Sequence, residues 1–511
     1  MSRVSSRSIL KNTLSGYLKF LVPFVIGMLL TPFIIRNIGV PAYGLWALVL
    51  SATGYFALLD LGFGQAIVRY VAMNKATGSR EQLNSLISTF LIIYAGMACI
   101  MLISTILLSL NFSRLFKVSP DQVSISQWAL LISGLGIALR FPLNIFGGIL
   151  YGHQRYDLAF VTEVSFYVIN AILTVVLLSS GHGLLALMIS ASGTSLAAGV
   201  VIAVHAFRVT GPLEIWPLRF EWSKVREILA FSIFFFVESL AVMISLRSDE
   251  VIIGIFLPTT AVAVYAISLK LSELVRNLAN QLNNILFPVA SELHALADTK
   301  RLRQVVLDGS RLSVTLAAGL GIGLIAIGRP FLGLWVGDEF LAGYPILVIL
   351  TLVAMAAVAQ DLPSKVLMIT GKQKLMAAVS LVDAFANATL SIILVQFMGI
   401  LGVALGTLVP FSAVVGFVLI YAARTIGLSI RSFAFALSFP GLLPGLAAGV
   451  AIWALQAWSY PDTWFDLGWQ GATGVVVFAG SCLSLGIVRL DRHTMIASAH
   501  ASARVAGSDA D

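Results

Sequence analysis

One stretch near the middle of the chain organises the rest. From Arg226 to Glu292 it reads REILAFSIFFFVESLAVMISLRSDEVIIGIFLPTTAVAVYAISLKLSELVRNLANQLNNILFPVASE. About 20 apolar residues span a bilayer as a helix, so this stretch is long enough for two spans. Pro258 falls between them, and proline lacks the N–H that a continuing helix requires. The stretch therefore predicts two membrane helices that are hinged at Pro258.

Charged and amide side chains follow both of these predicted helices. The first helix carries Glu238, Arg247, Asp249 and Glu250. In the second helix, polar residues recur at steps of three and four, which places them on one helical face. They are Lys270, Glu273, Asn277, Asn280 and Asn284, and the same helix carries Arg276. A charge at the bilayer centre costs about 2.5–3.5 kcal/mol, so we expect the stripe to face a wet cavity. Internal salt bridges that only join helices are the alternative.

Composition places the chain among polytopic membrane proteins. Hydrophobic residues make up 59% of the 511 residues and charged residues 11%, whereas soluble domains carry about 25% charged residues. The first apolar run, 16–38, is too long for a signal-peptide core and is expected to remain as a helix. Cys99 and Cys482 both lie in apolar runs, so we expect no disulfide and no metal. The net charge of +8 follows from topology and indicates no nucleic-acid partner.

The apolar runs predict an all-α fold with about 14 transmembrane helices. Outside the hairpin, their bounds are 16–38, 43–63, 83–110, 126–151, 158–180, 183–207, 312–335, 344–370, 375–397, 399–423, 433–458 and 467–488. A polar connection is expected after residue 63 and a charged loop at Leu293–Asp308. With a cytoplasmic N-terminus, the predicted outer side holds only Arg36, Arg114, Lys117 and Arg329. Basic residues favour cytoplasmic loops, so both termini are expected in the cytoplasm.

An internal repeat is visible in short matches at a nearly constant offset. Residues 152–155 (GHQR) match residues 371–374 (GKQK), an offset of 371 − 152 = 219, and Asn170-Ala171 matches Asn387-Ala388, an offset of 387 − 170 = 217. The repeat predicts two six-helix lobes that both point the same way, an architecture of transporters that rock around a central site. It also places Arg247–Glu250 inside a helix. The alternative ends that helix at Leu246 and exposes Arg247–Glu250 in an outer loop.

The predicted organisation has five parts. They are an N-terminal lobe at 1–207, a cytoplasmic linker at 208–225, a C-terminal lobe at 226–424, two extra helices at 425–489 and a cytoplasmic tail at 490–511.

A signature in the first two predicted helices resembles that of a known transporter family. It comprises Gly39-x-x-x-Tyr43-Gly44-Leu45-Trp46, Gly54-Tyr55, Leu58-Leu59-Asp60-Leu61-Gly62-x-Gly64 and Arg69-Tyr70-Val71-Ala72. These residues are similar to those of Wzx-type polysaccharide (O-antigen) flippases in the multidrug/oligosaccharidyl-lipid/polysaccharide exporter superfamily. The resemblance implies a two-lobed protein of the bacterial inner membrane. Such a protein would move an undecaprenyl-diphosphate-linked oligosaccharide to the outer leaflet by alternating access, in contact with membrane lipids and other polysaccharide-assembly proteins.

The chemistry of that substrate selects candidate residues. Arginine and lysine suit a diphosphate, and asparagine amides both donate to and accept from sugar hydroxyls. The substrate-binding candidates are Arg140, Arg247, Lys270, Arg276, Asn277, Asn280, Asn284 and Lys365. The acidic candidates are Asp60, Glu238, Asp249, Glu250, Glu273 and Asp361. The acids could pair with the cations, or they could bind a coupling H⁺ or Na⁺. No other cofactor is expected.

Two rival classes remain open. A cation-coupled drug antiporter of the same superfamily shares the fold, but its cavity would need fewer basic residues than this chain places in its helices. A membrane-embedded glycan ligase or polymerase would need an extramembrane catalytic face. The longest predicted outer connection, 111–125, has neither His nor Glu. The sequence therefore favours a transporter over an enzyme.

Overall fold

The computed structural model describes residues 6–77, 80–211 and 247–485 and six positions between 213 and 244; for residues 6–21 and 75–77 it describes the backbone alone. All regular elements in this described part are helical. Nine helical stretches within it are long and apolar enough to cross a membrane. The predicted all-α membrane fold is confirmed, and the count of 14 helices stays a prediction. Glu238, most of the linker and the tail lie outside the described residues.

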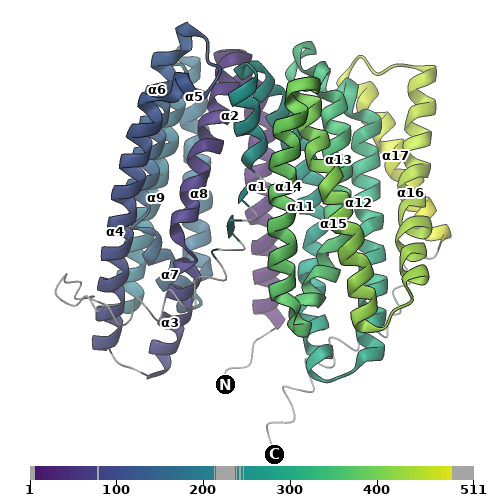
Figure 1. Cartoon of the computed structure of the whole chain (residues 1–511), viewed down its shortest axis with the longest axis horizontal. Coiled ribbons are helices and arrows are strands. Elements are labelled where there is room, and N and C mark those ends of the chain that lie inside the picture. Colours follow the sequence, from purple (N-terminus) through teal and green to yellow (C-terminus); the bar gives the residue numbers. More distant parts are fainter. Residues whose placement is uncertain are drawn as a thin grey trace, which may run out of the picture. The chain divides into compact units, whose positions relative to one another are not determined.

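The chain forms two compact units, the N-terminal unit (Val4–Ala263) and the C-terminal unit (Val264–Asp511). Figure 1 labels their helices. The N-terminal unit contains α1 (Ser6–Ile38), α2 (Val40–Gly54), α3 (Phe63–Thr77), α4 (Arg80–Leu110), α5 (Phe112–Leu115), α6 (Val123–Arg140), α7 (Asn144–Gly152), α8 (Tyr156–Ser179) and α9 (Leu184–Thr210). Short 3₁₀ turns at Tyr55–Asp60 and Pro120–Gln122 precede α3 and α6. Residues 247–256 add a further helical segment to this unit.

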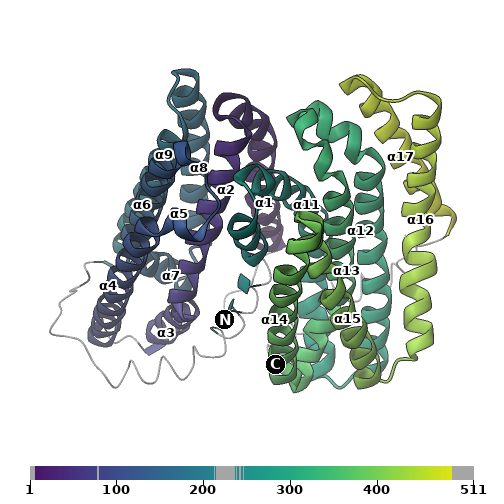
Figure 2. The same cartoon turned by 45° about the horizontal axis from the view of Figure 1, so that its top comes forward.

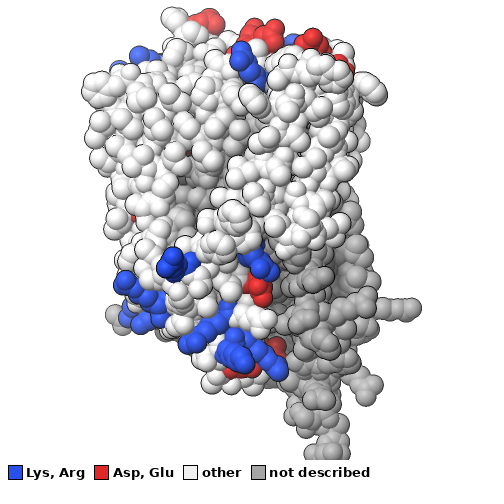
Figure 3. Space-filling model, turned by 90° about the vertical axis from the view of Figure 1, so that its right-hand side faces the viewer, with Lys and Arg blue, Asp and Glu red and all other residues white. Residues whose placement is uncertain are grey.

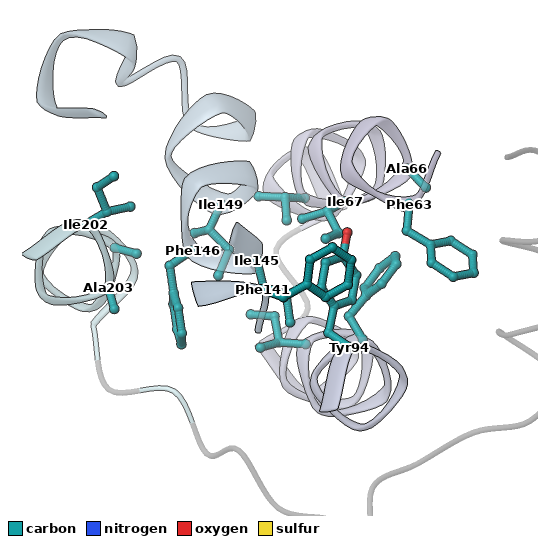
Figure 4. Close-up of a cluster of buried hydrophobic side chains, with 14 of the residues drawn as sticks. Phe63, Ala66, Ile67, Tyr94, Phe141, Ile145, Phe146, Ile149, Ile202 and Ala203 are labelled. Carbon is teal, nitrogen blue, oxygen red and sulfur yellow. The ribbon is translucent and has the colours of Figure 1, made fainter. Parts of the chain in front are cut away.

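The core of the N-terminal unit lies where α3, α4 and α7 meet (Figure 4). Tyr94 of α4 stacks on Phe141, with ring centroids 4.7 Å apart, and also contacts Phe63 of α3. Pro142 follows Phe141 and interrupts the span between α6 and α7, because proline cannot continue the helical hydrogen bonds. This break lets α7 pack against α3, where Gly152 leaves room for Val71.

The C-terminal unit is built from long helices. They are α11 (Thr259–Ala295), α12 (Thr299–Val336), α13 (Tyr344–Leu367), α14 (Gln373–Met398), α15 (Ile400–Ile426), α16 (Ile430–Trp458) and α17 (Trp464–Ser484). The first five residues of α11 belong to the N-terminal unit. Within the C-terminal unit, α16 packs along α12 and α17 packs on α16, at the edge of the helical bundle (Figures 1 and 2).

Two predicted connections turn out to be largely helical. The polar connection expected after residue 63 is mostly α3, and the loop expected at Leu293–Asp308 is helical apart from residues 296–298. Both predictions were wrong because they followed hydropathy, whereas helical backbone hydrogen bonds do not require apolar side chains. The start of α12 is also capped, since the Asp298 carboxylate accepts a hydrogen bond from the Arg301 N–H at 3.1 Å.

The break at Pro258 is confirmed. Residues 247–256 are helical, and α11 begins at Thr259. Arg247–Glu250 therefore lie in a helix, and the alternative that placed them in an outer loop is wrong. On the face drawn in Figure 3, basic residues are most frequent toward one end, residues of both charges lie at the other end, and a broad band almost without charges lies between them. A broad band of this kind is typical of a protein that spans a membrane.

Candidate functional site

The helical segment 247–256 packs antiparallel on α2. Arg247 lies over Gly54, Glu250 accepts a hydrogen bond from the Ser51 hydroxyl, and Gly254 faces Leu48. The approach is close because small residues form it: a Cβ on Gly254 would lie 2.5 Å from Leu48 Cδ1. Close contact between membrane helices depends on small residues in this way.

This contact assembles a group of charged and hydroxyl side chains, which we call the α2 charge cluster: Ser51, Arg247, Asp249 and Glu250. Ser51, Asp249 and Glu250 are buried. Arg247 Nη1 lies 3.9 Å from Glu250 Oε2, and the arginine side chain remains 46% exposed. An arginine has five N–H donors, so this loose pair leaves donors of Arg247 available to an anion.

Asp60 of the signature has a structural setting in the N-terminal unit. Its Oδ1 accepts a hydrogen bond from the Tyr94 hydroxyl at 2.5 Å, and its Oδ2 accepts one from the Gly64 N–H at 3.1 Å. Between them, Leu61 and Gly62 adopt positive φ angles of 50° and 78°, a conformation that glycine adopts without strain. The signature acid therefore holds the turn into α3 against α4.

Arg140 lies at the end of α6 in the same unit. Gly199 of α9 leaves room for it, because a Cβ there would lie 2.6 Å from Arg140 Nη1. That Nη1 is buried and has no hydrogen-bond partner among the described residues. Glu163 of α8 is near enough to interact with the guanidinium electrostatically. Arg140 thus combines a partly balanced charge with an unused donor.

In the C-terminal unit, the polar stripe of α11 divides into separate contacts. Arg276 Nη2 lies 3.1 Å from Glu273 Oε1, so these two residues form a pair within one helix. Lys270 and Asn277 are partly buried on the same helix. The pairing neutralises part of the charge of Arg276, so Arg276 is a weaker candidate for binding substrate.

Three of the predicted residues meet between α11 and α13, and we call them the α11–α13 charge cluster: Asn284, Asp361 and Lys365. Lys365 Nζ donates to Asp361 Oδ2 at 2.7 Å and to Asn284 Oδ1 at 2.8 Å. Asp361 and Lys365 lie four residues apart in α13, a spacing from which their pairing could be predicted. The contact with Asn284 spans 81 residues and has no local signal.

A buried amide that was not predicted from the sequence lies beside this cluster. Asn283 of α11 is fully buried and accepts a hydrogen bond from the Ser313 hydroxyl of α12 at 2.5 Å. Its own amide donates to the Val358 carbonyl of α13 and to Asn280 Oδ1, both at 3.4 Å. Asn283 therefore joins three helices. The doublet Asn283-Asn284 in an apolar span was the available signal.

The side chains of these groups are suited to recognising a polar ligand. Within the described ranges, no group of three His, Cys, Asp or Glu residues could hold a metal ion. The arrangement offers cationic donors, amides and hydroxyls inside helices, which suit an anionic and hydroxyl-rich ligand.

Comparison with known proteins gives a family match and two extended likenesses. The profile of the family described as "Polysaccharide biosynthesis protein" matches residues 6–294, more than half of the chain. The chain is 24% identical over 474 residues to the uncharacterized membrane protein EpsK of Bacillus subtilis, covering 90% of this chain and 91% of EpsK. It is 20% identical over 405 residues to a putative O-antigen transporter of Shigella flexneri, covering 78% and 94% of the two chains.

Two solved structures share the fold. The lipid II flippase MurJ in an inward closed conformation aligns with a TM-score of 0.72 at 16% identity, over 93% of this chain and 99% of MurJ. An inward-facing multidrug transporter of the MATE family aligns with a TM-score of 0.63 at 14% identity, over 80% and 98% of the two chains. At these identities the likeness concerns the fold alone.

Proposed function

The chain belongs to the polysaccharide biosynthesis protein family, and from that premise we propose that it flips an undecaprenyl-diphosphate-linked oligosaccharide from the cytoplasmic to the outer leaflet of a bacterial inner membrane. Its relatives include proteins named as O-antigen transporter and flippase, and it is a transporter rather than an enzyme. In this proposal both termini are cytoplasmic, and two lobes give access to each side in turn.

The proposal rests on the position and the exposure of Arg247. It lies within a helix, 3.9 Å from its carboxylate partner, with nearly half of its side chain exposed. An arginine fork binds phosphate oxygens in pairs, so Arg247 is suited to one phosphate of the diphosphate. The buried donor of Arg140 adds a second candidate contact. The asparagine amides of α11 that lie outside the α11–α13 charge cluster, Asn277 and Asn280, would serve the sugar hydroxyls.

The energetics of export fit an anionic substrate. Moving a negative charge out of a negative cytoplasm is favourable by about 2.3 kcal/mol per charge per 100 mV. The membrane potential therefore favours export of the anion by itself, and ion coupling stays an open alternative. A coupling H⁺ or Na⁺ at Asp249 or Glu250 would add to this driving force.

A deletion experiment tests the proposal. Without the protein, the lipid-linked oligosaccharide should accumulate in the cytoplasmic leaflet, and the surface polysaccharide should disappear until the gene is restored. The second candidate, a drug antiporter, is favoured only by the shared fold of the MATE transporter. It predicts instead increased sensitivity to cationic drugs with normal surface polysaccharide, and that outcome would refute the flippase proposal.

A further inference from the structure

The connection between α4 and α6 binds the turn at Pro258. In a continuous helix the Gly254 carbonyl would accept the N–H of residue 258, but proline has none. The Lys117 N–H fills that position, at 2.8 Å from the Gly254 oxygen. A buried carbonyl without a partner is costly, so the bond from Lys117 compensates for the break that Pro258 introduces.

The same turn is held on two sides. On one side, the Thr259 hydroxyl donates to Gln122 Oε1 at 3.3 Å, which adds a second bond to the connection. On the other side lies α2: a Cβ on Gly44 would lie 1.8 Å from the Thr259 carbonyl oxygen. Thr259 itself is buried. The turn at 254–259 therefore sits between α2 and the connection.

The connection is itself well anchored. Phe112 and Phe116 are buried, and their ring centroids lie 4.6 Å apart. The Phe116 N–H donates to the Phe112 carbonyl at 2.9 Å. This places the Lys117 N–H in a fixed direction, while the Lys117 side chain is exposed. The contact with Gly254 is therefore made by the backbone, and any residue except proline can provide it.

We propose that the connection 111–122 is a positioning element for transport. By satisfying Gly254 and Thr259, it holds the segment 247–256 in register on α2. That register brings Glu250 to Ser51 and Arg247 to Gly54. The connection thus affects transport through the positions of Arg247 and Glu250, although it lies far from both in the sequence. This role does not depend on which substrate the protein carries.

Proline substitutions separate the backbone bond from the side chain. Lys117→Pro removes the N–H, whereas Lys117→Ala keeps it. Ser119→Pro is a matched control, because Ser119 already has φ −65°, the value that proline prefers. The described backbone bonds of the connection also leave the Ser119 N–H unused.

Two readouts are made on the full-length protein in membranes. The first is export of surface polysaccharide at matched protein level. The second is the labelling of Leu48→Cys by an impermeant thiol reagent added from outside, in a chain whose Cys99 and Cys482 are replaced by Ser. Leu48 is fully buried against Gly254, so it reports undocking without any substrate. Met101→Cys, equally buried in α4, reports general unfolding.

Lys117→Pro should raise Leu48→Cys labelling about tenfold, the scale expected for a buried carbonyl that loses its partner. It should also lower export, with Met101→Cys unchanged. Lys117→Ala and Ser119→Pro should match the parent chain. Equal labelling in Lys117→Pro and Lys117→Ala would overturn the proposal, as would lost export without increased labelling.

If Lys117→Pro fails to accumulate, Gln122→Leu takes its place. This change removes only the bond to Thr259 and should raise Leu48→Cys labelling about threefold, since it removes a single partly exposed hydrogen bond. Unchanged labelling in Gln122→Leu would then overturn the proposal. Because labelling needs no substrate, a failed flippase assignment would leave this result intact, and the two failures can be told apart.

Discussion

Two charge clusters of this protein use similar residues but pair their charges differently. In the α2 charge cluster, Arg247 stands 3.9 Å from Glu250, and 46% of its side chain is exposed. In the α11–α13 charge cluster, Lys365 lies 2.7 Å from Asp361 and 2.8 Å from Asn284, and 22% of its side chain is exposed. Both clusters lie on helices of a membrane protein, where an unbalanced charge is costly.

A cation that binds substrate and a cation that joins helices differ in how many of their donors are already used. Lys365 has three donors and uses two of them, one to Asn284 of α11 and one to Asp361 in its own helix. Arg247 has five donors, and within the described part of the chain its ion pair with Glu250 is long, at 3.9 Å. We infer that the α11–α13 charge cluster joins helices, and that the α2 charge cluster keeps its cation available for substrate.

The α2 charge cluster depends on the close contact between α2 and Thr259, and breaking this contact should lower the stability of the protein most. Gly44→Ala would place a Cβ 1.8 Å from the Thr259 carbonyl oxygen, and a backbone atom cannot move away as a side chain can. We expect a loss of about 3 kcal/mol or more in unfolding free energy, measured by denaturation in detergent.

Gly96→Ala in α4 is the matched control, because nothing lies within 4 Å of its added Cβ. Alanine is favoured over glycine inside a helix by about 0.5–1 kcal/mol, so this variant should be at least as stable as the parent chain. Equal stability of both variants would mean that α2 does not approach Thr259 as closely as described.

Alanine substitutions of Arg247 and Lys365 should affect different properties of the protein. Arg247→Ala should lower polysaccharide export about tenfold or more at normal protein level, the loss expected for one charge-assisted hydrogen bond. Lys365→Ala should instead lower the unfolding free energy by about 1–3 kcal/mol, because Asp361 loses its partner. Export per folded molecule should change little in the lysine variant. Reduced stability in Arg247→Ala together with reduced export in Lys365→Ala would contradict the roles that we assign to the two clusters.

The smallest effect is expected for the pair on α11. Glu273 and Arg276 are both partly exposed and lie three residues apart, a geometry that contributes about 0.2–0.5 kcal/mol. Replacing both by Gln should leave the protein level and the melting temperature nearly unchanged. A marked loss of export in this double variant would show that Arg276 contributes to substrate binding after all.

The sequence predicted contacts that are local in the chain and missed those that are not. Pro258 marked the break, and Glu273 with Arg276 were recognisable as a three-residue pair. Ser51 and Glu250 are 199 residues apart, and Asp60 and Tyr94 are 34 apart; no periodicity connects them. Helices that extend past the apolar runs, such as α3, were not predicted. Hydropathy describes the side chains, whereas the hydrogen bonds of a helix are made by its backbone.

The need for Arg247 in translocation can be measured with the purified protein in liposomes. The protein is reconstituted into liposomes that contain an undecaprenyl-diphosphate-linked oligosaccharide, and an impermeant glycosidase added outside measures the accessible fraction. The parent chain should make the internal pool accessible, Arg247→Ala should leave it protected, and Lys365→Ala should behave like the parent chain. Equal protection of the lipid-linked oligosaccharide in liposomes with the parent chain and in liposomes without protein would show that the protein does not flip this lipid.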